Sequence, residues 1–135
     1  MQKVVLDTNI LVSALWSPNG NPFKVLEKVL NNELNLYFTN EIYEEYEEVL
    51  YREKLAFPHD KVAKVLDEIS EKGVLVEVNK SAIDFADESD RKFYDTAKAN
   101  NAIVITGNLK HYPENKDIML ATDFLVHINE VINVR

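Results

Sequence analysis

The stretch Val4-Val5-Leu6-Asp7-Thr8-Asn9 decides the fold that the sequence predicts. Three consecutive apolar residues, two of them β-branched, are typical of a short strand buried on both faces. The polar triplet interrupts this strand, and an apolar helical pattern follows it over residues 10–15. Asp7 is therefore expected at the carboxyl end of a strand, which is the edge where ligands bind in open α/β sheets.

Short apolar runs and amphipathic stretches alternate along the rest of the chain. Further strands are expected at residues 36–39, 74–78, 102–105 and 118–120. Helices are expected at residues 23–30, 41–51 with Asn40 as N-cap, 61–71 ended by Gly73, 90–100 and 123–131. Because strands alternate with helices, the sequence predicts a single three-layer α/β/α domain over residues 1–135 with a mostly parallel central sheet.

The composition is that of an ordinary globular domain. With 46% hydrophobic and 28% charged residues, intrinsic disorder is excluded. No apolar run approaches the length of a membrane span and no secretory signal is recognisable. The absence of cysteine excludes disulfides and thiolate metal sites, and agrees with a cytoplasmic location. The net charge of −8 argues against charge-driven binding to nucleic acid, although cations bound at an acidic site would permit a nucleic-acid enzyme.

Three acidic side chains in the first half of the chain stand out by position. Asp7 is either a helix N-cap or a ligand at the sheet edge, and the two roles can coexist. On the helix predicted over residues 41–51, Glu45 and Glu47 flank the apolar face on opposite sides. The helical wheel does not choose between these two glutamates, and both could instead be ordinary solvent-exposed charges.

Further polar groups are expected near the same edge from the second half of the chain. Asp90 shares the apolar face of its helix at the N-terminus, where it either caps the helix or is stabilised by the helix dipole as a ligand. Asp87 lies one turn earlier, and Asp95 is expected to face solvent. The next strand ends in Thr106-Gly107-Asn108, and a parallel arrangement would bring this polar end beside Asp7.

Four polar motifs thus follow one another in a fixed order: Asp7-Thr8-Asn9, Glu45, Asp90 and Thr106-Gly107-Asn108. This order, together with the elements that flank each motif, resembles a PIN domain over essentially the whole chain. PIN domains are small metal-dependent nucleases, and many bacterial and archaeal members are VapC-like toxins of toxin–antitoxin pairs. The stretch from Asp90 to Tyr94 and the triplet His111-Tyr112-Pro113 further resemble a subgroup of toxin components.

The resemblance implies a metal site and a reaction. Asp7, Glu45 and Asp90 would bind Mg²⁺ or Mn²⁺, and the resemblance favours Glu45 over Glu47. It implies hydrolysis of an RNA phosphodiester that leaves a 5′-phosphate and a 3′-hydroxyl, an antitoxin partner, and a homodimer. Residues expected to orient ligands, water or substrate around the three acids are Thr8, Asn9, Asp87, Thr106, Arg91 and Lys110.

Asn108 departs from the pattern of the family and keeps other functions open. Many PIN domains have a fourth acid at this position, and a neutral amide removes one negative charge from the metal site. A catalytically weak PIN-like domain that acts through partner binding is therefore one alternative. A receiver-type phosphoacceptor module is another, but it would need an acidic pair near the first strand, where this chain has Asp7 alone. Trp16 and the tyrosines are expected in the core rather than stacked on bases.

Overall fold

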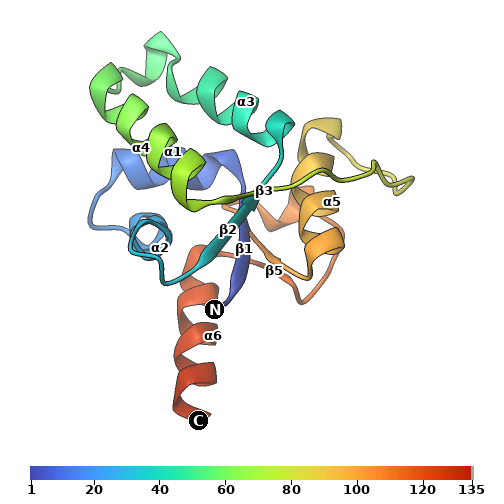
Figure 1. The fold of residues 1–135 in the computed structure, drawn as a ribbon. Coiled ribbons are helices and arrows are strands. Elements are labelled where there is room, and N and C mark those ends of the chain that lie inside the picture. The colour runs from blue at the N-terminus through green and yellow to red at the C-terminus, as the bar shows by residue number, and fades with distance from the viewer. Residues whose placement is uncertain (135) are drawn as a thin grey trace.

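Five parallel strands form one central sheet in the computed structural model, which describes residues 1–134, with side chains up to Asn129 (Figure 1). The strand order is β3-β2-β1-β4-β5, and each neighbouring pair is parallel. The strands are β1 (Lys3–Leu6), β2 (Asn35–Phe38), β3 (Val74–Leu75), β4 (Ile103–Ile105) and β5 (Ile118–Met119). The predicted parallel α/β sheet is confirmed.

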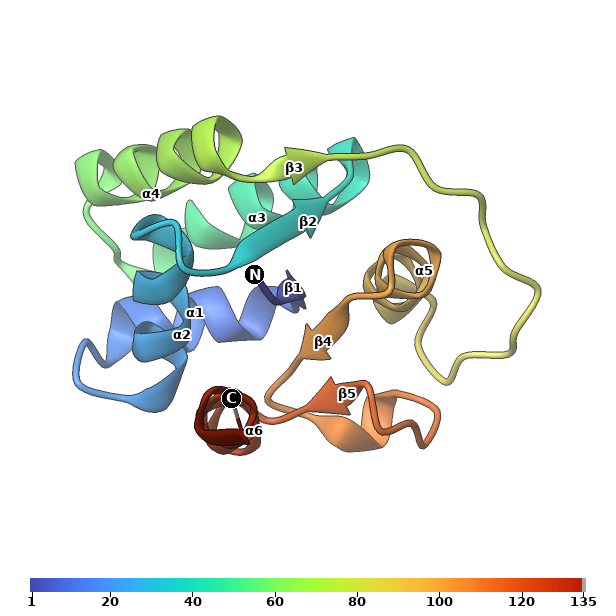
Figure 2. The same cartoon turned by 60° about the horizontal axis from the view of Figure 1, so that its bottom comes forward.

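Helices cover both faces of this sheet. They are α1 (Thr8–Trp16), α2 (Asn21–Leu30), α3 (Asn40–Leu50), α4 (His59–Lys72), α5 (Arg91–Asn100) and α6 (Ala121–Val134). Figure 2 shows α5 on one side of the sheet and α1, α2 and α6 on the other, which confirms the three-layer prediction. No helix within residues 1–134 combines the length and the hydropathy needed to cross a membrane.

The strand β1 lies at the centre of the sheet between β2 and β4. Its three apolar residues have no exposed surface, as expected for a strand with parallel neighbours and helices on both faces. The register pairs Leu6 with Ile105, so that Asp7 and Thr106 leave the sheet side by side. The backbone N–H of Asp7 donates to the carbonyl of Ile105 at 2.9 Å, which extends the pairing to the start of the loop. The sheet register therefore brings the two polar motifs together.

Two of the predicted boundaries are wrong by a few residues. The strand predicted over residues 74–78 ends after two residues, because its only partner β2 ends at Phe38 and leaves nothing to pair with. The N-cap of α3 is Thr39 rather than Asn40, since the Thr39 hydroxyl accepts a hydrogen bond from the N–H of Ile42 at 3.2 Å. Both differences follow because β2 ends at Phe38, one residue before the predicted end of this strand.

Three side chains lie in environments opposite to those predicted. Trp16 and Tyr51, both expected in the core, are 59% and 37% exposed, and Trp16 touches Phe57 edge to face at the end of α1. Asp95, expected in solvent, is buried and accepts a hydrogen bond from the N–H of Ser81 at 2.9 Å. The chain after β3 packs over the polar side of α5, so that side is covered although its sequence pattern resembles a solvated one.

Candidate active site

Asp7 is buried at the carboxyl end of β1, at the N-cap position of α1. Its side chain makes no capping hydrogen bond, so the capping interpretation is wrong for the carboxylate. Instead, Oδ2 accepts hydrogen bonds from the hydroxyl of Thr106 at 2.9 Å and from the phenol of Tyr112 at 2.8 Å. The carboxylate is therefore held toward β4, along the edge of the sheet.

Tyr112 is a contributor to this edge that the sequence reasoning did not assign. Its ring is buried, and burial together with the charge of Asp7 raises the pKa of the phenol far above its ordinary value. The phenol therefore remains a hydrogen-bond donor to Asp7 at any physiological pH. The signal available in the sequence was the triplet His111-Tyr112-Pro113, which the resemblance singled out without giving the tyrosine a role.

Glu45 faces the same edge from α3, whereas Glu47 is exposed. One oxygen of Glu45, Oε2, accepts a hydrogen bond from the hydroxyl of Thr8. The other oxygen, Oε1, lies 2.8 Å from the ammonium of Lys92, a side chain that is only 10% exposed. Both oxygens of Glu45 are thus engaged with groups of this chain, one neutral and one positively charged.

Asp90 is buried at the N-cap position of α5 and, like Asp7, makes no side-chain capping bond. Among the described side chains, Asp90 Oδ2 is a buried oxygen without a hydrogen-bond partner, although His111 Nδ1 lies 3.3 Å away. Burial and then the negative charge of Asp7 raise the pKa of Asp90 to about 6, and His111 offsets this only in part. Added positive charge near Asp7 and Asp90 would therefore stabilise the ionised carboxylate of Asp90.

Hydrogen bonds tie the start of α1 to the loop after β4. The amide oxygen of Asn9 accepts a hydrogen bond from the N–H of Gly107 at 3.0 Å, and a side chain at Gly107 would crowd that oxygen. The N–H of Asn108 bonds the hydroxyl of Thr106, and its amide nitrogen lies 2.8 Å from His111 Nε2. These bonds hold the start of α1 against the loop after β4.

Three of the predicted supporting residues make their contacts elsewhere or face solvent. Asp87 accepts hydrogen bonds from the N–H and hydroxyl of Ser89, which lower its pKa. Arg91 is buried and pairs with Glu88 at 2.6 Å. Lys110 is exposed on the loop after β4. In this structure, the acidic edge is therefore supported by Thr8, Thr106 and Asn9, rather than by Asp87 or Arg91.

The donor set fits a hard divalent cation. Such cations take carboxylate oxygens, and Asp7 is near enough to Asp90 for its negative charge to raise the pKa of Asp90. Within residues 1–129, however, no three His, Cys, Asp or Glu side chains lie close enough together to hold a cation as they stand. Glu45 would have to exchange its present partners before it could join the two aspartates around one ion.

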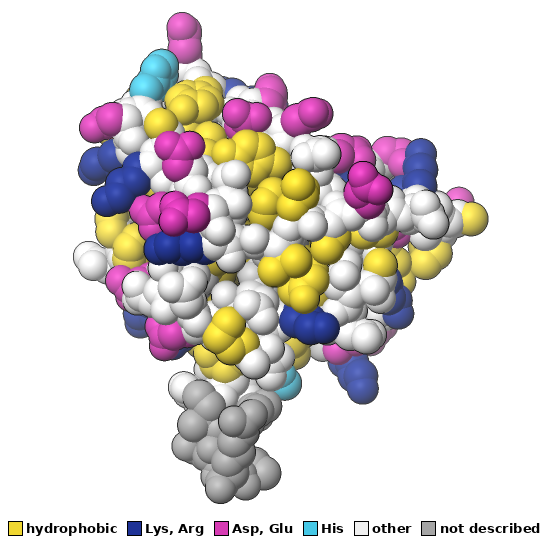
Figure 3. Space-filling view, viewed as in Figure 1, with side chains coloured by type: hydrophobic (Ala, Val, Ile, Leu, Met, Phe, Trp, Pro, Cys, Tyr) yellow, Lys and Arg dark blue, Asp and Glu magenta, His cyan; other side chains and the backbone are white. Residues whose placement is uncertain are grey.

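The face of the molecule viewed in Figure 3 does not offer a general surplus of positive charge. On the face viewed in Figure 3, Asp and Glu side chains lie over α3 and α4, with hydrophobic side chains exposed between them. This distribution agrees with the net charge of −8. An anionic substrate would therefore have to be met by cations close to the acidic edge.

The fold and the site define a class: a parallel α/β protein with buried carboxylates gathered at the carboxyl edge of its central strands. Residues 3–110 match the family model of the PIN domain, and the chain belongs to the PIN domain family, whose members are generally metal-dependent nucleases. The chain is also 33% identical over 109 residues to the uncharacterized protein MJ1680 of Methanocaldococcus jannaschii, a match that covers 78% of this chain and 70% of that relative. The PIN domain recognised in the sequence is thus confirmed.

A solved structure shares the fold. The crystal structure of VapBC2 from Rickettsia felis, bound to a DNA fragment from their promoter, superposes with a TM-score of 0.56. The match covers 88% of this chain and 97% of that chain, at 18% sequence identity. At this identity, the likeness establishes a common PIN-like architecture and no more.

Proposed function

We propose that the protein is a divalent-metal-dependent endoribonuclease and the toxin component of a toxin–antitoxin pair. The observation that carries the proposal is the pair of buried aspartates, Asp7 and Asp90, of which Asp90 has an oxygen without a hydrogen-bond partner. A buried carboxylate with a raised pKa beside a second one is costly to keep unless a cation binds there. Membership of a family of metal-dependent nucleases supports the reaction type.

The residues of this chain would act mainly by holding the acids in place. Thr106 and Tyr112 donate to one oxygen of Asp7, which fixes the orientation of the carboxylate. Thr8 does the same for Glu45 from the first turn of α1. When bound, Mg²⁺ or Mn²⁺ would supply an acidic water as the nucleophile and would stabilise the charge that develops on the phosphate.

The proposed partners are an RNA strand, an antitoxin and a second copy of the chain. RNA agrees with the activity proposed for the acidic edge, where Lys92 and His111 stand within reach of the carboxylates. The antitoxin is supported by the shared fold with a chain of VapBC2, which was solved as a complex on promoter DNA. The homodimer follows only from the family resemblance.

The test compares Asp7→Asn with wild type in the hydrolysis of single-stranded RNA with Mn²⁺. We expect wild type to cleave internal phosphodiesters and leave 5′-phosphates, and Asp7→Asn to lose about a hundredfold or more of the rate. Asp67→Asn is the matched control, because Asp67 is exposed on α4, outside the edge that carries Asp7. Absence of hydrolysis by wild type on every single-stranded RNA tested, or equal rates for Asp7→Asn and wild type, would overturn the nuclease proposal.

A further inference from the structure

We propose that Lys92 is a tethered cation that neutralises Glu45 in the metal-free protein and moves to an RNA phosphate when a divalent ion takes Glu45. The inference rests on the proposed function and adds a residue-specific role to it. Lys92 would thus serve the same site twice, first as a counter-ion for an acid and then as a ligand for the substrate.

The present contacts of Lys92 are those of a counter-ion inside the site. Its ammonium lies 2.8 Å from Glu45 Oε1, donates to the carbonyl of Ser89, and stands 5.1 Å from the centre of the Phe93 ring. With 10% of the Lys92 side chain and 25% of Glu45 exposed, water screens this pair less than a surface pair. A divalent ion that binds Glu45 must compete with this ammonium.

Two other cations are already paired with exposed acids. Arg91 pairs with Glu88 at 2.6 Å, and Arg52 pairs with Glu48 at 2.7 Å on the outer side of α3. In contrast, Lys92 is paired with an acid of the site itself. Lys92 is therefore released when Glu45 changes partner, and binding of a metal ion to Glu45 would cause that change.

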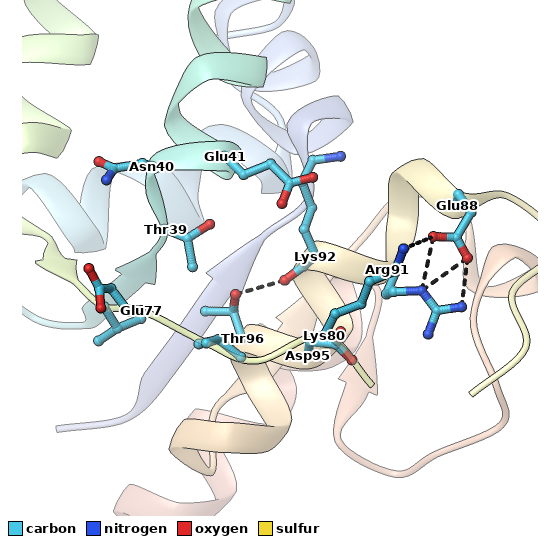
Figure 4. A pocket seen from close by; sticks show the side chains of 12 residues that line it. Thr39, Asn40, Glu41, Glu77, Lys80, Glu88, Arg91, Lys92, Asp95 and Thr96 are labelled. Carbon is cyan, nitrogen blue, oxygen red and sulfur yellow. Dashed lines mark hydrogen bonds and ion pairs between the residues drawn. The ribbon is translucent and has the colours of Figure 1, made fainter. Parts of the chain in front are cut away.

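The structure also offers a place for the released ammonium. Lys92 lines a cleft of about 410 Å³ between the start of α3, the chain after β3, and α5. Figure 4 shows the Lys92 side chain reaching from α5 toward Glu41 along the wall of this cleft, with Thr39 and Thr96 nearby. Because lysine has a flexible four-carbon stem, the ammonium can swing into the cleft without displacing the core.

The cleft is also where an RNA strand that passes the acidic edge could place a phosphate. It adjoins the edge through Lys92 itself, and Thr39 also lines it. The acids Glu41 and Glu77 would repel a phosphate, and the two other cations that line the cleft, Lys80 and Arg91, are both paired with Glu88. A released ammonium would therefore make the cleft more receptive to a phosphate. Lys92 is placed to provide that charge as soon as Glu45 is bound to metal.

The test measures metal affinity and RNA affinity separately, in the full chain. Lys92→Met keeps the apolar stem and removes the charge, Lys92→Arg keeps the charge, and Lys98→Met on the exposed side of the same helix is the matched control. Mn²⁺ binding is followed by calorimetry without RNA. Binding of a single-stranded RNA is followed at several salt concentrations with Ca²⁺, which takes the same oxygen ligands.

We expect Lys92→Met to bind Mn²⁺ about tenfold more tightly than wild type, because the competing ammonium is gone. We expect the same variant to bind RNA more weakly, with the slope of log affinity against log salt reduced by about 0.7, the value of one phosphate contact. Lys92→Arg should retain the wild-type slope, and Lys98→Met should match wild type in both measurements. Circular dichroism verifies that each variant is folded.

Either an unchanged Mn²⁺ affinity or an unchanged salt slope in folded Lys92→Met would overturn the role of Lys92. That result is distinguishable from failure of the proposed function. If wild type binds no Mn²⁺ and Asp7→Asn behaves identically, the metal-dependent nuclease itself is wrong. If wild type binds Mn²⁺ and Asp7→Asn does not, while Lys92→Met equals wild type, only the inference about Lys92 is wrong.

Discussion

Replacing Asp90 by Asn should stabilise the metal-free protein, although it removes a proposed metal ligand. Asp90 is buried beside Asp7, and one of its oxygens lacks a hydrogen-bond partner. Folding therefore raises the pKa of Asp90 from 3.8 to about 6. At neutral pH, the folded protein holds an ionised carboxylate that would be more stable in water, and an amide at this position carries no charge.

The size of the effect follows from the shift in pKa. Since one pKa unit corresponds to about 1.4 kcal/mol, ionised Asp90 lowers the free energy of unfolding by about 2–3 kcal/mol. The pKa is higher in the folded state, so this cost is absent below about pH 4, grows as the pH rises, and is complete above about pH 6. An imperfectly bonded amide offsets part of the gain, and we expect Asp90→Asn to be more stable than wild type by about 1–2 kcal/mol at pH 7.

The assay is urea unfolding in EDTA at several pH values between 3.5 and about 7.5. The advantage of Asp90→Asn over wild type should grow between pH 4 and pH 6, and a saturating addition of Mn²⁺ should stabilise wild type more than the variant. Asp87→Asn is the matched control, because Ser89 lowers the pKa of Asp87 and the expected pH dependence has the opposite sign. A stability difference between Asp90→Asn and wild type that does not vary with pH would refute the reasoning.

Three further substitutions test other contacts of the site and the core. Tyr112→Phe removes a donor to the buried Asp7 carboxylate and should cost about 1–3 kcal/mol in urea unfolding; an unchanged midpoint would contradict the role of the phenol. Gly73→Ala would place a Cβ 2.6 Å from Phe38 Cε1 and 2.7 Å from the Ile69 carbonyl, and should lower stability by about 1–3 kcal/mol in the same assay. Asn108→Asp adds a carboxylate near the site and should tighten Mn²⁺ binding in calorimetry, whereas equal affinity would place residue 108 outside the metal group.

The elements of the sheet could be predicted from the sequence because their signals are local. A buried parallel strand such as β1 needs apolar residues on both faces, and its run of three stands out from the polar residues on either side. The alternation of such runs with amphipathic helices favours a parallel sheet, whereas the order β3-β2-β1-β4-β5 is known only from the structure. The position of Asp7 at the carboxyl end of β1 is a consequence of the same pattern.

Burial of individual polar side chains could not be read in the same way. The environment of Asp95 was predicted from the periodicity of its own helix, which reports only where the apolar side lies, and that of Trp16 from its residue type. Asp95 is buried because the chain after β3 packs over a polar side of α5, whereas Trp16, the last residue of α1, is exposed. The segment that covers Asp95 is not visible in the sequence of α5 itself.

The amino-acid sequence by itself determined the order of strands and helices along the chain, the parallel sheet, and the arrival of polar motifs at one edge, because each depends on hydrophobic patterns of a few residues. Only the tertiary structure decided which groups touch there. Tyr112 donates to Asp7 across a separation of 105 residues, and Lys92 pairs with Glu45 from a different helix. Such contacts depend on the packing of elements far apart in the chain, on which local patterns carry no information.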